Sequence, residues 1–432
     1  MLRFFTSGES HGPALTAIID GMPAGLMIDV ESINAELAKR QQGYGRGNRQ
    51  KIETDTVSFL GGVRHGVTTG APITLTVANR DFANWKYVMS VEPTDMTTDE
   101  AKEQAQKKAI ERFRPGHADL AGTLKYDHSD IRDVLERASA RETAARVAVG
   151  ALCQQLLTAI GARSVNHVIQ VGTVKCAALP VDISLSDVEK LASESELSAT
   201  DKSVETAMKD AIKAAWQEGD SLGGVVEVLV DGLPVGLGSY TQWDRKIDGR
   251  IAQAVMSIQA FKAVEIGDGV LSASLPGSQV HDPLYQSDKV GANSVLPFVR
   301  KTNHAGGIEG GMTNGSRLVV KGYMKPLPTM RKGLDSLSFP EFEPARAHYE
   351  RSDVCAIAAA SVVMKAMVNY VLADALLEKF ACDSIRALKE SLESYTLRVQ
   401  NFAADKGGDR ADSAKKTANL NVEEGPELIG EF

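Results

Sequence analysis

The residues best suited to chemistry in this chain form the segment Arg112-Phe113-Arg114-Pro115-Gly116-His117-Ala118-Asp119. Two arginines, a histidine and a carboxylate surround a Pro-Gly break, which is typical of a turn. Such a group is costly to bury, but on a cleft it can bind a phosphate or carboxylate beside a titratable imidazole. A second cationic cluster, Arg137-Ala138-Ser139-Ala140-Arg141-Glu142, opens a predicted helix, and helix N-termini favour anions. Together the two clusters predict a polyanionic substrate or cofactor.

Another histidine, His11, lies in the segment Gly8-Glu9-Ser10-His11-Gly12 near the start of the chain. This segment formally matches the G-x-S-x-G nucleophile elbow. An elbow serine follows a central strand and needs an upstream loop, but only seven residues precede this segment. The hydrolase interpretation is therefore not favoured. On a tight turn beside a glycine, His11 is a candidate acid or base, with a plain surface-turn histidine as the alternative.

Two glycine-rich segments could approach a charged ligand closely. Residues 37–52 contain no acid, and their loop reads Gly-Tyr-Gly-Arg-Gly-Asn-Arg over residues 43–49. Its third glycine comes one residue too early for a dinucleotide fingerprint, and it follows a predicted helix rather than a strand. The loop is interpreted either as a flexible basic segment or as a flap whose arginines bind phosphate, namely Arg40, Arg46 and Arg49. Residues 303–315 hold five glycines and could equally form hairpin turns.

The bulk composition is that of an ordinary soluble globular protein, with 43% hydrophobic and 24% charged residues. The net charge of −8 argues against generic binding to nucleic acid or anionic membranes, which requires a basic surface. The four cysteines lie far apart without CxxC spacing, so neither a metal site nor a redox motif is expected. We find no signal-peptide pattern, and the apolar run 355–364 is too short to span a bilayer. These features indicate a cytoplasmic protein.

The pattern of apolar residues predicts the elements that must position these groups. We expect strands over 2–6, 14–20, 56–60, 73–77, 225–230 and 318–320, and helices over 30–41, 97–112, 140–160, 251–261 and 356–380, with further helices between 184 and 218. Ser139 and Glu142 match a capping box for the helix 140–160. Residues 267–288 have loop chemistry, and the polar end, residues 403–432, is expected to be disordered. Strands and helices without regular alternation favour an α+β fold over a doubly wound sheet.

Taken together, these segments resemble those of the chorismate synthase family. The resemblance is carried in order by Ser7-Gly8-Glu9-Ser10-His11-Gly12, by Arg40 through Arg49, by Arg114 to Asp119, by Arg137 to Thr143, by Gln259-Ala260-Phe261-Lys262, by Asn303 to Gly315, by Met324-Lys325-Pro326 and by Arg351-Ser352-Asp353. Each motif is weak alone, but the ordered set is specific and covers residues 1 to about 400. It implies one large domain, residues 1–402, built as a β-α-β sandwich with helices packed between antiparallel sheets and long glycine-rich active-site loops.

The resemblance also implies a reaction. The family converts 5-enolpyruvylshikimate 3-phosphate to chorismate, by 1,4-anti elimination of phosphate and a C6 proton, in the shikimate pathway of aromatic amino-acid biosynthesis. Reduced FMN is required without net redox change, NADPH is a possible reductant, and a homotetramer is implied. By motif, His117 would protonate the reduced flavin, His11 would give a proton to the departing phosphate, and Asp353 would assist removal of the C6 proton, through the flavin N5. Asp119, at first sight the partner of His117, ranks below Asp353 as the catalytic carboxylate.

The remaining site residues follow from the same motifs. Substrate anions would be held by Arg49, Arg114 and Arg141, and NADP by Arg40 and Arg46. FMN contacts would come from Arg137, Ala138, Ser139, Gln259, Ala260, Gly310, Lys325, Pro326, Leu327, Pro328, Thr329 and Arg351. Ala138 lacks the hydroxyl and the segment 325–329 the serines of some family members, so backbone contacts are the ones expected there.

Two other functions remain open from the sequence. An NADPH-dependent flavin oxidoreductase would use the same cofactor, but it would consume NADPH stoichiometrically and ignore the shikimate ester. A non-catalytic protein that binds phosphorylated metabolites would bind the ester without releasing phosphate. Loss of His11 and His117 would leave the affinity of such a protein largely intact.

Overall fold

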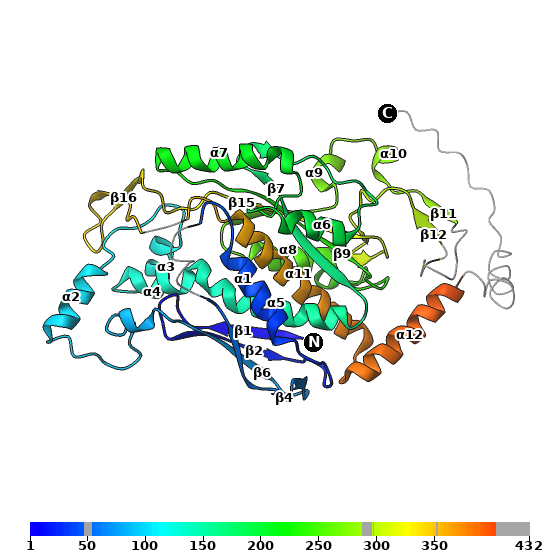
Figure 1. Cartoon of the computed structure of the whole chain (residues 1–432), viewed down its shortest axis with the longest axis horizontal. Helices are drawn as coiled ribbons and strands as arrows, with labels where there is room; N and C mark the ends of the chain where they lie inside the picture. Colours follow the sequence, from blue (N-terminus) through cyan, green and yellow to red (C-terminus); the bar gives the residue numbers. More distant parts are fainter. Residues whose placement is uncertain (47–53, 287–295, 297, 351–352, 403–432) are drawn as a thin grey trace, which may run out of the picture. The chain divides into compact units, whose positions relative to one another are not determined.

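The computed structural model describes residues 1–46, 54–286, 296, 298–350 and 353–402 (Figure 1). The tail expected at 403–432 lies outside the described residues. The chain separates into two compact units, of which the larger comprises residues 1–282 and 302–388. The smaller unit contains an antiparallel ribbon of β11 (Leu284–Gln286) and β12 (Phe298–Arg300). The elements discussed below belong to the larger unit, whereas helix α12 (Ile385–Asn401) belongs to the smaller unit from Lys389 onward.

The first sheet contains four antiparallel strands in the order β1-β2-β6-β3. They are β1 (Arg3–Ser7), β2 (Ala14–Asp20), β6 (Ile73–Ala78) and β3 (Val57–Gly61). In β6, Ile73, Leu75 and Val77 are buried, whereas the threonines between them are half-buried. This alternation gives the sheet one core face. The two strands predicted on either side of His11 pair directly, so the turn that carries His11 sits at the end of a hairpin.

The second sheet contains five antiparallel strands in the order β10-β15-β9-β7-β8. They are β10 (Phe261–Ile266), β15 (Leu318–Met324), β9 (Gly224–Asp231), β7 (Arg163–Val171) and β8 (Val174–Lys175). Strand β15 is longer than the predicted 318–320, because Gly322 and Tyr323 continue its ladder with β9. Strands β7, β8 and β10 are not among the strands expected from the sequence. Short antiparallel ribbons add β4 (Val63–Arg64) with β5 (Val67–Thr68), β13 (Ile308–Glu309) with β14 (Met312–Thr313), and β16 (Asp335–Leu337) with β17 (Pro344–Arg346).

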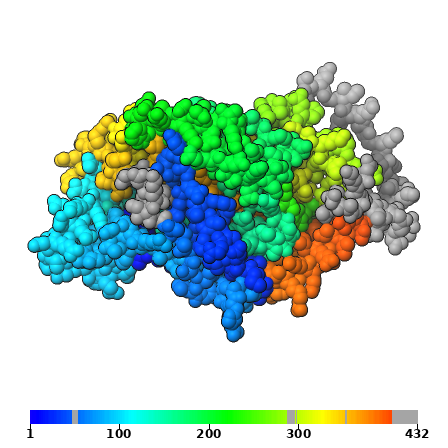
Figure 2. All heavy atoms as spheres, in the orientation of Figure 1, coloured from blue at the N-terminus to red at the C-terminus, as the bar shows by residue number. Residues whose placement is uncertain are grey.

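Two apolar helices connect the sheets. Helix α5 (Thr143–Thr158) contacts β1, β2 and β6, whereas α11 (Ile357–Phe380) contacts β7, β9 and β15, and the two helices pack on each other (Figure 1). Their approach is very close, since a Cβ at Gly150 would lie 2.3 Å from Ala366 Cα. Helix α1 (Val30–Gln41) packs against both helices, and Figure 2 shows its outer side at the surface. The expected mixed α+β class with antiparallel sheets is therefore confirmed.

Helix α11 is the one helix of the described chain that is long and apolar enough to cross a membrane. However, 89% of its most apolar window is buried inside the protein. A helix that is apolar on all sides and enclosed by other elements is a core helix.

The remaining helices surround this core. They are α2 (Asp99–Lys107), α3 (Asp119–Tyr126), α4 (Ile131–Ala138), α6 (Leu185–Ser193), α7 (Lys202–Glu218), α8 (Ile247–Met256), α9 (Gly269–Ser272) and α10 (Gly277–Val280). The helix predicted over 251–261 corresponds to α8, which ends at Met256. The prediction is wrong at its end, because Phe261 begins β10 and pairs with Met324. Helices α3 and α4 are not among the helices predicted from the sequence.

The predicted capping box at Ser139 is wrong. Ser139 Oγ accepts a hydrogen bond from the backbone N–H of Arg141 rather than that of Glu142, and it opens a single 3-10 turn, Ala140–Glu142, ahead of α5. The Glu142 carboxylate does not return to this N-terminus but binds Arg146 and Thr6. The chain therefore turns sharply between α4 and α5, and Ser139 lies at the corner.

Candidate active site

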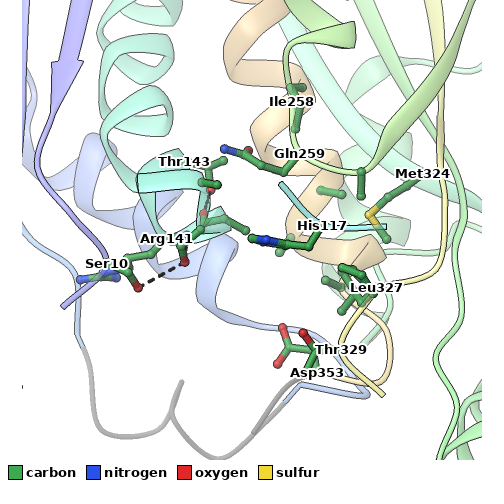
Figure 3. Close-up of a pocket in the computed structure, with 18 of the residues that line it drawn as sticks. Ser10, His117, Arg141, Thr143, Ile258, Gln259, Met324, Leu327, Thr329 and Asp353 are labelled. Carbon is green, nitrogen blue, oxygen red and sulfur yellow. Dashed lines mark hydrogen bonds between the residues drawn. The ribbon is translucent and has the colours of Figure 1, made fainter. Parts of the chain in front are cut away.

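One cavity of about 580 Å³ opens between the elements that carry the predicted motifs (Figure 3). This size is typical of small-molecule sites. Its walls come from the turn after β1, the end of α1, the turn before α3, the corner between α4 and α5, the segment between α8 and β10, the loop after β15 and the start of α11. Segments that are distant in the sequence therefore meet at one site.

His11 is held on one side of this cavity by a buried carboxylate. Its Nδ1 lies 2.9 Å from both carboxylate oxygens of Glu136, and its backbone N–H donates to Glu136 Oε2 at 2.8 Å. Arg132 Nη1 donates to Glu136 Oε1 at 2.8 Å from one turn earlier in α4. Burial by itself would raise the pKa of Glu136, but the hydrogen bonds from His11 and the charge of Arg132 outweigh it, so this pKa lies below its ordinary value. Glu136 is therefore an anion that accepts the Nδ1–H of His11.

His117 has the same kind of support. Its Nδ1 lies 2.5 Å from Asp119 Oδ1, and Arg114 donates to the two oxygens of Asp119 through Nε at 2.8 Å and Nη2 at 3.0 Å. Desolvation of Asp119 is outweighed by these donors, which hold its pKa well below the usual range. Because a carboxylate only accepts, the 2.5 Å contact with Asp119 favours a proton on Nδ1. Arg114 Nη2 also lies 3.0 Å from this Nδ1 and 3.5 Å from Nε2, and Nε2 is the ring nitrogen that Asp119 leaves for a ligand.

Two arginines share one buried carboxylate at the corner between α4 and α5. Arg141 Nη1 donates to Asp55 Oδ2 at 2.6 Å, and Arg40 Nη1 lies 3.5 Å from the same oxygen. Arg40 Nε also donates to Thr143 Oγ1 at 3.0 Å. Both guanidinium groups line the cavity, and guanidinium groups bind carboxylates and phosphates through paired N–H donors. This wall of the cavity is therefore suited to an anionic ligand.

Asp353 lies at the start of α11 and forms an ion pair with Arg46, whose Nε is 3.1 Å from Asp353 Oδ2. The backbone fixes this pair, because Gly45 O accepts hydrogen bonds from the N–H groups of Val354 and Cys355. Gly45 has a φ of +87°, and a Cβ there would lie 3.0 Å from Ile212 Cγ2. The close contact between the two chain segments thus depends on a glycine.

Comparison with known proteins identifies the family. A chorismate synthase family model matches residues 2–377. The chorismate synthase of Brevibacillus brevis is 50% identical over 401 residues, covering 93% of this chain and 100% of that protein. That of Desulforamulus reducens is 52% identical over 395 residues, covering 91% and 98%. A crystal structure of a chorismate synthase has a TM-score of 0.72 and 39% identity, and the match covers 93% of this chain and 98% of that one.

The chain belongs to the chorismate synthase family.

Chorismate synthases use reduced FMN, and the apolar part of the cavity fits a flat ring. Small side chains on one side of α11, Ala356, Ala359, Ala360 and Val363, face the cavity together with Met324 and Leu327. Gln259 donates to Glu142 through Nε2, whereas its buried Oε1 accepts no hydrogen bond from the described residues. Buried polar atoms are normally paired. The Gln259 Oε1 beside these apolar side chains could therefore accept a hydrogen bond from an N–H group of a bound flat ring.

Most of the residues expected from the chorismate synthase motifs meet at this cavity. Its lining includes His11, His117, Asp353, Arg40, Arg46, Arg114, Arg141, Ala138, Ser139, Gln259, Ala260, Lys325, Leu327, Pro328 and Thr329. Three others do not line it, namely Arg137, Gly310 and Pro326. The side chain of Arg137 instead donates to the backbone oxygens of Thr6 and Gly8. Arg49 and Arg351 lie outside the described residues.

The acids that support the site are not predicted by the sequence motifs. Glu136 and Asp55 belong to none of the predicted site motifs, and Asp119 holds His117 although the motifs rank it below Asp353. Trp85, which stacks on His11 with ring centroids 3.7 Å apart, was also missed. The two-residue spacing between His117 and Asp119 is a sequence signal from which their contact could be predicted. No sequence signal links Glu136 to His11, because the contact spans 125 residues.

Proposed function

We infer that this chain catalyses the chorismate synthase reaction, the 1,4-anti elimination of phosphate from 5-enolpyruvylshikimate 3-phosphate. The observation that carries this inference is the cavity that joins two carboxylate-supported histidines, an aspartate and at least four arginines beside an apolar slot. The substrate carries two carboxylates and one phosphate, which match a cationic wall. A lyase that acts on a phosphate ester needs both a proton for the leaving group and a group that assists removal of the carbon-bound proton.

We assign the proton at the leaving phosphate to Nε2 of His11. Glu136 anchors the opposite ring nitrogen, so His11 can carry a second proton while its ring stays fixed. Arg141 and Arg114 are the proposed clamps for substrate anions, with Arg49 as a further proposed donor. Asp353, paired with Arg46, is the proposed carboxylate that assists removal of the C6 proton.

Reduced FMN, when bound, supplies an electron-rich ring that can stabilise electron deficiency or donate transiently toward an allylic phosphate. The residues proposed to hold it are Gln259, Ala260, Ala138 and Ser139 at one end, and Lys325 with Thr329 at the other, with Arg137, Gly310, Pro326, Leu327, Pro328 and Arg351 as further contacts. His117, fixed at Nδ1 by Asp119, offers Nε2 to the cofactor. The apolar residues of α11 exclude water from this region.

Four further features of the family are proposed for this chain. NADPH is the proposed reductant, with Arg40 and Arg46 as its contacts. A homotetramer and a cytoplasmic location complete the proposal, together with a single β-α-β sandwich domain over residues 1–402. Light scattering measures the assembly, and anaerobic bleaching of FMN by NADPH measures the intrinsic reductase activity.

An anaerobic assay with dithionite-reduced FMN and the shikimate ester tests the main inference. We expect release of phosphate together with the absorbance of chorismate, and no stoichiometric consumption of reductant. Reductant consumption without phosphate release would favour a flavin oxidoreductase. Binding of the ester by folded protein without any turnover would favour a phosphometabolite-binding protein.

A further inference from the structure

Two histidines line the cavity, and both are supported in the same way although the supporting residues differ in sequence spacing. His117 is held by Asp119, two residues away, and Asp119 also accepts from Arg114 and from the Arg114 backbone N–H. His11 is held by Glu136, and Glu136 accepts from Arg132 and from the His11 backbone N–H. The tertiary fold therefore builds a second histidine–carboxylate–arginine group, equivalent to the first.

Resting on the function inferred above, we propose that Glu136 is a positioning residue for His11. It fixes the ring tautomer so that Nε2 is the nitrogen presented to the substrate, and Trp85 fixes the plane of the ring. The tautomer follows from donor chemistry. A carboxylate only accepts hydrogen bonds, and both oxygens of Glu136 lie 2.9 Å from His11 Nδ1, so the proton of the neutral ring resides on Nδ1.

Glu136 is well built for this role. Its side chain is fully buried, whereas 9% of the His11 side chain is exposed. Arg132 keeps Glu136 ionised and in place, and the backbone oxygen of Glu136 accepts from the N–H of Ser10. The turn that carries His11 is thus tied to α4 at three points. A carboxylate held in this way orients an imidazole and stabilises the imidazolium that forms during proton transfer.

Trp85 supplies the second constraint. Its ring stacks on the imidazole with an interplanar angle of 22°, and its Nε1–H donates to Asp81 Oδ2 at 3.0 Å. Lys108 Nζ lies 4.1 Å from the centroid of Trp85, and the Arg132 guanidinium lies 5.1 Å from it. Rotation of the His11 ring would break both the stack and the bond to Glu136. The charged groups next to the His11 ring and Trp85 are Glu136, Arg132, Lys108 and Asp81. The other charged or titratable residues that line the cavity are Arg40, Arg46, Arg114, His117, Arg141, Lys325, Glu350 and Asp353.

Nitrogen NMR of the full chain, labelled with ¹⁵N-histidine and studied without ligands, tests the tautomer directly. We expect the neutral ring of His11 to be the Nδ1–H form. The Nε2–H form in the unaltered protein would overturn the proposal without any variant. This measurement does not depend on turnover. An active enzyme with the Nε2–H tautomer would contradict this proposal alone. An inactive enzyme with the Nδ1–H tautomer would contradict the lyase function alone.

The variant Glu136→Gln tests the consequence for catalysis. The substitution removes the negative charge that holds the His11 ring and stabilises its imidazolium, so we expect kcat to fall about 10- to 100-fold and the alkaline limb of the pH profile of kcat to move to lower pH. Glu136→Asp should restore part of the rate, and Trp85→Phe should be milder than Trp85→Ala. Asp133→Asn is the matched control, because Asp133 lies on the same helix and faces His128 instead. A fall in rate for Glu136→Gln with an unmoved limb and an unchanged tautomer would show a merely structural role and overturn the proposal.

Discussion

Arg46 and Asp353 come from opposite ends of the chain and form an ion pair of 3.1 Å at the cavity. The exposed fraction of the side chain is 10% for Arg46 and 19% for Asp353, so the pair is largely shielded from water. Removing one partner of a buried pair leaves the other charge uncompensated. The residue that resemblance assigns to NADPH is therefore also the counter-ion of the proposed catalytic carboxylate.

This pairing predicts that Arg46→Gln impairs turnover even when FMN is reduced chemically. Without the guanidinium, Asp353 loses an ion-pair partner at 3.1 Å, so we expect kcat to fall about 10- to 100-fold, at or below the lower end of the range for loss of a proton-transfer group. The assay is phosphate release with dithionite-reduced FMN, and Arg64→Gln on the exposed β4 strand is the control. A defect seen with NADPH but not with dithionite would assign Arg46 to the nucleotide alone.

His117→Ala should fold and bind FMN yet lose most of its turnover. Its Nε2 is the ring nitrogen available to a ligand, because Asp119 holds Nδ1, and loss of a proton-transfer group costs about 10²- to 10⁴-fold in rate. Fluorescence quenching of FMN measures binding, and single-turnover phosphate release measures chemistry. His128→Ala provides a comparison outside the cavity lining. Unchanged turnover in His117→Ala would remove this residue from the mechanism.

Gly150→Ala should destabilise the core, because the added Cβ would meet the backbone of Ala366 at 2.3 Å. Forcing α5 away from α11 costs about 1–3 kcal/mol, as in other overpacked cores. Gly249→Ala is the matched change, since Gly249 is an exposed residue in α8 with nothing within 4 Å of its Cβ position. We expect that change to stabilise the protein by about 0.4–1 kcal/mol through the unfolded state. Melting temperatures measure both, and equal shifts would contradict the packing argument.

The free energy of unfolding should decrease at acid pH, because Glu136 and Asp119, which support the two histidines, become protonated there. Glu136 and Asp119 have pKa values below their ordinary values of 4.5 and 3.8. Groups with lowered pKa values contribute stability that is present above their ordinary pKa and is lost as pH falls through the folded pKa. The melting temperature should therefore drop steadily below about pH 4.5. Asp119→Asn should reduce the steepness of that drop, and an unaltered slope would show that Asp119 does not contribute to it.

Local sequence patterns are enough to predict much of the scaffold and the family. The apolar periodicity gave α1 at residues 30–41 as observed, and it located the paired strands around His11 and the core helix α11. These elements are set by local signals, namely the N-cap at Asp29, alternation in strands and a continuous apolar run. The cationic motifs also predicted most residues of the cavity, because guanidinium groups are suited to phosphate and carboxylate recognition.

The tertiary structure alone decided which residues act together. Asp119 could be paired with His117 from its spacing, but Glu136 reaches His11 across 125 residues and Asp55 reaches Arg141 across 86. Such contacts depend on how α4, α5 and the first sheet meet. The same holds for the corner at Ser139, where the local capping pattern was overridden because Glu142 finds partners in Arg146 and Thr6. Side-chain partners at long sequence separation are set by packing, which local patterns do not encode.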